Sequence, residues 1–153
     1  MDREALHALY VRLEKPLYNA VYRWVWNSEE AAEVVQEGFV RLWGMRDRVD
    51  MSTVEPLIWR ITLNQAAKRH RSRKRWQTLP WMDRAGVAEE DPLVRQDVRD
   101  AVEALPEELR QVVLLCSFSG MSYAEVGEVL GIPEGTVGSR KNRAMTCLKE
   151  SLQ

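Results

Sequence analysis

The chain has 153 residues, of which 45% are hydrophobic and 29% are charged, fractions typical of a globular protein rather than a disordered one. The formal net charge of −1 argues against indiscriminate binding to nucleic acids. The charges are unevenly placed, because residues 68–75 are almost wholly basic and residues 83–108 are rich in acids. This separation favours a basic surface for phosphate groups beside an acidic neighbour.

The first helix is predicted from an apolar stripe at helical spacing between residues 6 and 25. Pro16 lies inside this stripe and has no N–H to donate, so we expect a kink or a break there. Asn27 or Ser28 is expected to end the segment and to cap a following helix.

A second helix is predicted over residues 31–46. Its buried side is expected to consist of Val35, Phe39, Leu42 and Trp43. Its opposite side carries the polar groups Glu33, Gln36, Glu37 and Arg41. A polar helix face usually serves solvation, so this pattern by itself does not indicate a partner.

The third predicted helix follows a polar connection over residues 46–53, with Ser52 or Thr53 as its cap. Its apolar side is supplied by Leu57, Ile58, Ile61 and Ala66. The basic run over residues 68–75 forms its end, where cations complement the helix dipole. Six cations within eight residues exceed what a dipole requires, so we expect contact with phosphate.

Residues 76–91 contain Pro80, Gly86 and acids without a sustained period, and they are predicted to form a linker. The expected fold is therefore all-α, with two small helical domains over residues 1–75 and 92–153. Residues of the two domains expected to be buried include Trp24, Trp43 and Trp59 and, in the second domain, Leu109, Val112, Val113, Cys116, Phe118, Val137, Ala144, Leu148 and Leu152.

The second domain centres on a predicted helix-turn-helix over residues 122–140. Ser122 followed by Glu125 forms a capping box, so a helix should start directly after Ser122. Gly131 can supply the left-handed residue that ends it, and Pro133 suits the start of the next helix. The second of these helices can enter a major groove. An ordinary helical hairpin with solvated charges is the alternative.

No catalytic constellation is apparent, since there is no nucleophile beside a base and no glycine loop for phosphate. Cys116 and Cys147 lack metal-ligand or redox spacing, and His7 and His70 do not form a ligand cluster. We find neither a signal-peptide pattern nor a run of about 20 apolar residues. We expect a cytoplasmic binding protein without metal or cofactor, rather than an enzyme.

The ordered pattern resembles the extracytoplasmic-function (ECF) sigma factors, the smallest bacterial transcription initiation factors. Residues 31–43, AAEVVQEGFVRLW, are similar to the family's second region, whose acid-rich helix docks on the polymerase clamp. Residues 58–64, IWRITLN, followed by cations, resemble the helix that reads the minus-ten element. Residues 105–107, 120–125 and 131–140 resemble the fourth region, which reads the minus-thirty-five element.

This resemblance implies core RNA polymerase and promoter DNA as partners, and an anti-sigma protein as a further one. The polymerase contacts it implies are Glu30, Glu33, Gln36 and Glu37. The minus-ten contacts it implies are Asn64, Lys68, Arg69 and Arg71. The minus-thirty-five contacts it implies are Thr136, Ser139, Arg140, Asn142 and Arg143.

Four residues depart from the family's pattern. Ala32 stands where a second acid is common, which removes one charge-assisted contact to polymerase. Gly138 replaces a commonly basic residue and weakens helix propensity by up to ~1 kcal/mol relative to Ala. Cys116 stands where Arg is frequent, and Lys141 where an apolar residue is usual. These changes bear on promoter strength and sequence preference more than on the fold.

Two other functions explain parts of the chain. A helix-turn-helix regulator that does not dock on polymerase would account for residues 105–152, but not for an acid-rich helix followed by a basic one. A protein-interaction adaptor that has lost DNA binding would account for Gly138 and Cys116. A sigma factor accounts for both halves, and we take it as the primary expectation.

Overall fold

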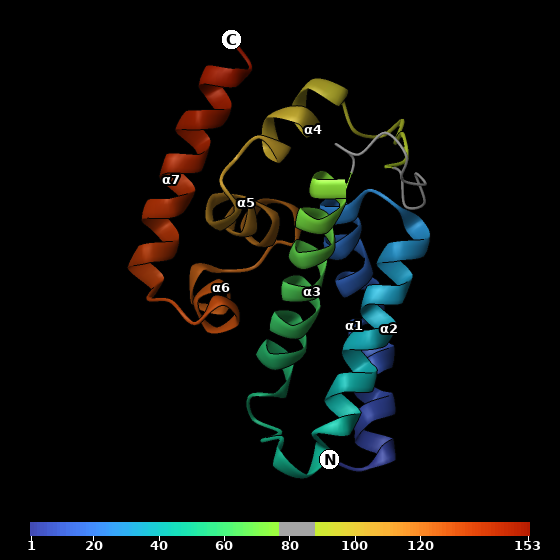
Figure 1. Ribbon diagram of the computed structural model, residues 1–153. Coiled ribbons are helices and arrows are strands. Elements are labelled where there is room, and N and C mark those ends of the chain that lie inside the picture. The colour runs from blue at the N-terminus through green and yellow to red at the C-terminus, as the bar shows by residue number, and fades with distance from the viewer. Residues whose placement is uncertain (77–87) are drawn as a thin grey trace. The chain divides into compact units, whose positions relative to one another are not determined.

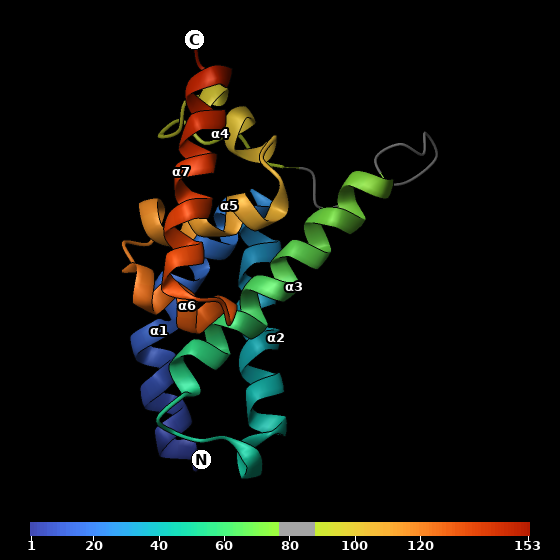
Figure 2. The same cartoon turned by 90° about the vertical axis from the view of Figure 1, so that its left-hand side faces the viewer.

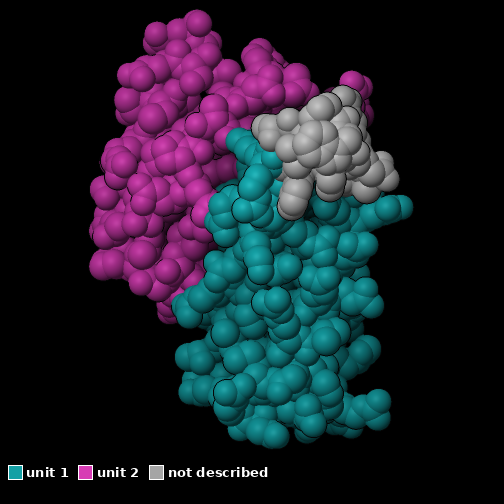
Figure 3. All heavy atoms as spheres, in the orientation of Figure 1, with its two compact units in different colours: residues 1–89 teal, residues 90–153 magenta. Residues whose placement is uncertain are grey.

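The structure is a computed structural model that describes residues 1–76 and 88–153. Most of the predicted linker, residues 77–87, lies outside the described residues. Every regular element within the described ranges is a helix, which confirms the all-α prediction (Figure 1). The chain forms two compact units, Met1–Glu89 and Glu90–Gln153 (Figure 3).

The first unit is built from three helices, α1 (Arg3–Val25), α2 (Ser28–Gly44) and α3 (Val54–Trp76). A short 3-10 turn, η1 (Arg46–Arg48), lies between α2 and α3. Each helix packs against the other two, and α3 crosses the pair formed by α1 and α2 obliquely (Figure 2). The side chains buried between them include Leu17, Val21, Trp24, Val34, Leu42, Ile58 and Leu63.

Helix ends of the first unit follow local capping rules. Asn27, rather than Ser28, caps α2, because its side-chain oxygen accepts the Glu30 N–H at 2.9 Å. Pro16 does not split α1, which continues through it on an exposed side of the helix. Trp26 ends α1 in the left-handed conformation, with φ at 51°.

Close packing of α2 on α3 depends on Gly38. A Cβ at this position would lie 2.5 Å from Cγ2 of Thr62. The buried Thr62 hydroxyl donates to the carbonyls of Ile58 and Trp59, at 3.0 and 3.1 Å, so it needs no partner on α2. The resulting short separation brings the polar face of α2 within reach of the long basic side chains of α3.

The second unit contains α4 (Gln96–Glu103), α5 (Glu107–Val113), a π-helical turn η2 (Leu114–Phe118), α6 (Tyr123–Leu130) and α7 (Glu134–Ser151). Its core between α5 and α7 consists of Leu105, Leu109, Val113 and Ala144, with Cys147 and Leu148 packed against it. Two residues expected in the core, Phe118 and Leu152, are exposed. The wider π-turn shifts Phe118 off the 3.6-residue pattern, and Leu152 lies just beyond the end of α7.

The predicted helix-turn-helix corresponds to α6 and α7. The Ser122 hydroxyl accepts the Glu125 N–H and the Glu125 carboxylate accepts the Ser122 N–H, each at 3.1 Å, which confirms the capping box. Hydrogen bonding from the Ser122 N–H and the Ser122 side chain to the Glu125 carboxylate lowers the pKa of Glu125. Gly131 has φ of 69° and ends α6, as predicted. None of the helices that the structure describes is both long and apolar enough to cross a membrane.

Candidate functional site

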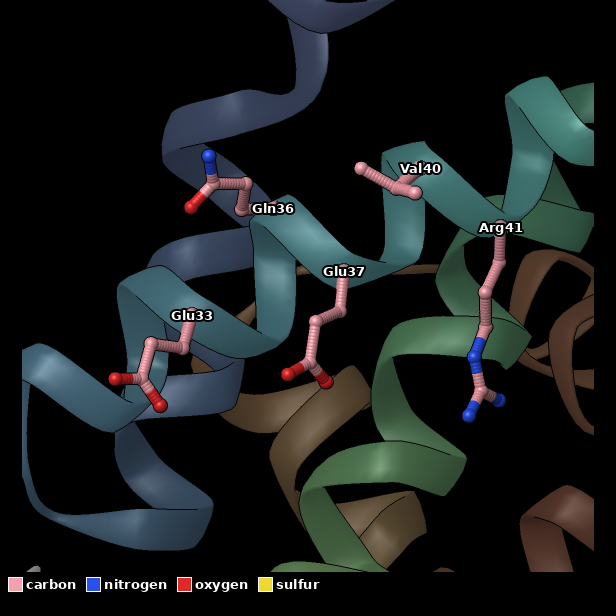
Figure 4. Close-up of a pocket in the computed structure, with 5 residues that line it drawn as sticks. All are labelled: Glu33, Gln36, Glu37, Val40 and Arg41. Atoms are coloured by element: carbon pink, nitrogen blue, oxygen red, sulfur yellow. The ribbon is translucent and has the colours of Figure 1, made fainter.

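The polar face of α2 lines an open groove on the first unit (Figure 4). The lining side chains, which project from successive turns of the helix, are Glu33, Gln36, Glu37, Val40 and Arg41. Three of the four predicted polymerase contacts therefore lie together, and Glu30 lies outside the groove. Val40, 65% exposed, is a residue that sequence reasoning missed, although its spacing from Gln36 and Glu37 places it on the same face.

The two groove carboxylates are held by one arginine of α3. The guanidinium of Arg69 donates to Glu33 and to Glu37, each at 2.8 Å, and Gln65 Nε2 lies 3.4 Å from the second carboxylate. The Arg69 side chain is only 21% exposed. Four residues further along α3, Arg73 pairs with Glu30 and donates to the Val25 carbonyl. Arg69 and Arg73 thus join α3 to α2.

A different face of α3 is exposed and carries a stripe of cations with one amide. Its members, spaced four, four, three and four residues apart, are Arg60, Asn64, Lys68, Arg71 and Arg75. This spacing places them on one side of an α-helix. The predicted minus-ten residues therefore divide: Asn64, Lys68 and Arg71 share the stripe, whereas Arg69 faces α2. Arg60 was missed in the sequence, where its position one turn before Asn64 is the available signal.

This division predicts opposite outcomes for two pairs of basic residues. If Lys68 and Arg71 contact promoter phosphates, as the sequence predicts, replacing both by Ala should make the salt dependence of promoter binding shallower, by about 0.7–0.9 in log–log slope per lost phosphate contact. Replacing Arg69 and Arg73 by Ala should instead lower the unfolding free energy by about 1–3 kcal/mol, because charged hydrogen bonds to α2 are lost. Salt titrations and denaturant unfolding of both double variants test this. An unchanged slope for the first pair would assign Lys68 and Arg71 to solubility only.

The connection between α2 and α3 is ordered by local bonds. The Asp50 carboxylate accepts the Ser52 N–H at 2.9 Å and the Ser52 hydroxyl at 2.8 Å, and these bonds lower the pKa of Asp50. The guanidinium of Arg46 lies 4.4 Å from the centroid of a Trp43 ring, and the chain's N-terminal amine donates to the Arg46 carbonyl. A loop fixed in this way presents its exposed side chains in a defined arrangement.

Helix α7 exposes a polar face in the second unit. Ser139, Asn142 and Arg143 are exposed, as the recognition-helix prediction requires, and Thr136 is half-buried. Thr146 and Lys149 continue the exposed face by one further turn and were missed. The signal for both was their spacing of seven residues from the two predicted residues Ser139 and Asn142.

Arg140 differs from its neighbours on α7. Its side chain is 23% exposed, against 62% for Arg143, and lies 3.6 Å from a carboxylate oxygen of Glu108 on α5. The same carboxylate lies 3.7 Å from Arg143. Glu108 therefore holds Arg140 against α5. The role of Arg140 as a DNA contact stays a prediction.

Gly138 and Lys141, two residues that depart from the family's pattern, both lie beside the ring of Tyr123. A Cβ at Gly138 would lie 3.3 Å from Cε2 of Tyr123, and the half-buried Lys141 places its ammonium 5.4 Å from the Tyr123 ring centroid. Cys116 is half-buried, and this burial raises the pKa of its thiol, an effect that the charge of Lys141 offsets only in part. Tyr123 thus fills part of the space above the glycine, at the flank of the exposed α7 face.

Replacing Gly138 by Arg is expected to strengthen binding of the minus-thirty-five element by about 1–3 kcal/mol, since one good base contact contributes that much. The Tyr123 ring must move by a few tenths of an ångström, which its partial exposure permits. Gly138→Ala is the matched control, because it adds the same Cβ and helix propensity without a donor. Titration of promoter duplex at fixed salt measures both. Equal gains from Ala and Arg would attribute the effect to helix propensity.

Comparison with known families agrees with this division of the chain. Residues 9–77 match the family model described as Sigma-70 region 2. Residues 95–148 match the model described as Sigma-70, region 4. The first range contains the α2 groove and the whole α3 stripe, and the second contains the helix-turn-helix.

The curated relatives of the chain are also described as RNA polymerase sigma factors. The chain is 35% identical over 147 residues to ECF RNA polymerase sigma factor SigE of Mycolicibacterium smegmatis, a match that covers 89% of this chain and 57% of that protein. It is 26% identical to ECF RNA polymerase sigma factor SigW of Bacillus subtilis, covering 99% of this chain and 91% of the relative. It is 29% identical to the RNA polymerase sigma-H factor of Pseudomonas aeruginosa, and this match covers 99% of this chain and 88% of the relative.

Solved structures show the same fold. CnrH, in complex with the cytosolic domain of CnrY, matches with a TM-score of 0.75 and 24% identity over 99% of this chain and 89% of that one. RpoE of Bartonella quintana, in complex with the anti-sigma factor NepR, matches with a TM-score of 0.72 and 22% identity. This match covers 95% of this chain and 95% of that one. Two helical units that carry regions 2 and 4 in this order define a sigma factor of the sigma-70 type. The chain belongs to the ECF sigma factors within that family.

Proposed function

We propose that this sigma factor binds core RNA polymerase and directs promoter recognition and transcription initiation, with the first unit on the minus-ten element and the second on the minus-thirty-five element. The observation that carries this proposal is the order of three surfaces along one chain. These are the acidic groove on α2, the basic stripe on α3 and the exposed polar face of α7. A regulator without polymerase docking would have no use for the first surface.

The α2 groove supplies the polymerase contact. Glu33 and Glu37 lie one turn apart and are held by Arg69, so cations of a partner meet two ordered carboxylates. Val40 adds apolar surface beside them that a partner can bury. Ordering the carboxylates in advance reduces the entropy lost on binding. Gln36 completes the proposed contact.

At the minus-ten element, the α3 stripe meets the strand that must separate. Unstacking a base costs a few kcal/mol, so a factor that opens DNA must offset this cost with new contacts. Lys68 and Arg71 are placed to neutralise phosphates, and the Asn64 amide between Arg60 and Lys68 can donate and accept hydrogen bonds at a base edge. These roles are proposed for the exposed stripe and not for Arg69.

At the minus-thirty-five element, α7 serves as the recognition helix. Its N-terminus can direct N–H groups at a phosphate, while Ser139, Asn142 and Arg143 face the groove of the duplex. Few of these side chains can form bidentate base contacts, so we expect weak binding by this unit alone. Attachment to polymerase through the first unit would raise its local concentration at the promoter.

Further parts of the proposal concern domains and partners. We propose domains at residues 1–75 and 92–153 with a linker at residues 76–91, acting in the cytoplasm without catalysis or cofactor. The structures of CnrH and RpoE contain CnrY and the anti-sigma factor NepR, respectively. By analogy, we propose an anti-sigma protein as a further partner of this chain.

The test is reconstitution with core RNA polymerase, followed by sequencing of the DNA that the complex retains. The expected result is enrichment of sequences with two elements, and specific transcription from them in a run-off assay. Binding of a two-fold symmetric operator without polymerase would support the regulator instead. Failure to retain any specific DNA with polymerase present would support the adaptor.

A further inference from the structure

Glu89, the last residue of the first unit, is fastened to the junction of α1 and α2. Its main-chain N–H donates to the carbonyl of Trp26. Its carboxylate accepts the Ser28 N–H at 3.1 Å, the Ser28 hydroxyl at 2.7 Å and the Tyr22 hydroxyl at 3.5 Å. We call Glu89 with Tyr22, Trp26 and Ser28 the clasp.

Several features show that the clasp is a built site. Ser28 is the first residue of α2, so the Glu89 carboxylate lies at the positive end of a helix dipole. The Ser28 bonds lower the pKa of Glu89, because they stabilise the ionised form of its carboxylate. The carbonyl that accepts from Glu89 belongs to Trp26, which is buried and, within the described residues, is the one non-glycine residue with positive φ. Its ring packs edge-on against Tyr22 at 5.5 Å between centroids.

The clasp controls how much chain can extend between the two units. With the clasp closed, residues 90–95 precede α4, and six extended residues span at most about 20 Å. With the clasp open, the chain between the end of α3 and the start of α4 is roughly twenty residues, which can span about 65–70 Å. Elements centred at minus ten and minus thirty-five are about 25 base pairs apart, or roughly 85 Å of B-form DNA.

We propose that the clasp holds the free factor in a short-tether state and opens when the factor engages both promoter elements. The second half of this inference rests on the proposed function. The short tether cannot by itself bridge the separation between the two elements, whereas the long tether supplies most of it. A closed clasp therefore lowers the apparent affinity of the factor for polymerase and promoter in proportion to the fraction of molecules in which the clasp is open.

The test compares Glu89→Ala with Glu90→Ala, which removes the same charge from the next, exposed residue. Amide hydrogen exchange should show residues 28 and 89 protected in the free factor and exchanging faster in the complex with polymerase and promoter. Glu89→Ala should accelerate exchange at Ser28 in the free factor. It should also tighten assembly on polymerase and promoter about three- to tenfold, as removal of a closed state requires. Ser28→Ala should act in the same direction, and Glu90→Ala should leave both readouts unchanged.

Two results would overturn the proposal. One is protection of both amides that persists in the promoter complex, since the clasp would then stay closed while both elements are bound. The other is an assembly affinity for Glu89→Ala no tighter than for Glu90→Ala. Wild-type factor that gives no promoter-specific transcription would count against the proposed function itself, while exchange in the free factor still reports whether the clasp forms.

Discussion

Reversing Glu33 and Glu37 to Lys is expected to abolish binding to core RNA polymerase while the first unit stays folded. Truncating one partner of a desolvated charge pair costs about 2–5 kcal/mol, and reversing two charges adds repulsion. Affinity should therefore fall by more than about a thousandfold. The loss of fold stability should be much smaller, because partly exposed ion pairs such as those with Arg69 contribute about 0–1 kcal/mol each.

Glu29→Lys is the matched control for this variant. Glu29 is an exposed acid on the first turn of the same helix, and it does not line the groove. Co-purification with core polymerase measures docking, and tryptophan fluorescence during denaturant unfolding measures stability. All six tryptophans precede residue 82, so their fluorescence does not report on the second unit. Undiminished co-purification of the double variant would remove the assignment of the α2 groove to polymerase.

Replacing Gly127 by Ala is expected to destabilise the helix-turn-helix by about 1–3 kcal/mol, as overpacking of a well-packed site does. A Cβ at Gly127 would lie 2.8 Å from the carbonyl oxygen of Ile132. That oxygen belongs to the backbone of the turn and cannot rotate away as a side chain would. The turn between α6 and α7 must therefore move, which changes the direction of the recognition helix. Binding to the minus-thirty-five element should weaken together with stability.

Gly135→Ala provides the contrast within the same motif. A Cβ at Gly135 meets no atom within 4 Å, so this substitution should be neutral or should stabilise α7 by up to ~1 kcal/mol. Far-UV circular dichroism or hydrogen exchange is needed here, because residues 90–153 contain no tryptophan. Equal stability of the two alanine variants would show that the turn accommodates a methyl group at Gly127 without cost.

Local signals in the sequence were sufficient for the helices and their ends. The capping box at Ser122, the left-handed Gly131 and the cap of α2 all form as predicted, because each involves residues within a few positions of one another. Apolar periodicity located buried residues of α1, α2 and α3 such as Leu17, Leu42 and Ile58 for the same reason. Trp43, Leu57 and Ile61, which were expected on the buried sides, are only half-buried. The order of the acidic and basic helices, together with the helix-turn-helix, was enough to indicate the family.

Tertiary structure alone decided which charges meet. In the sequence, Arg69 and Arg71 belong to one basic run, but helical rotation turns the first toward Glu33 and Glu37 on α2 and leaves the second exposed. The same holds for Arg140, which packs beside Glu108, and for Phe118, which a π-turn moves out of the core. The clasp joins Glu89 to Ser28 across about sixty residues of sequence. Periodicity carries no information on such pairs, because they depend on how separate helices pack.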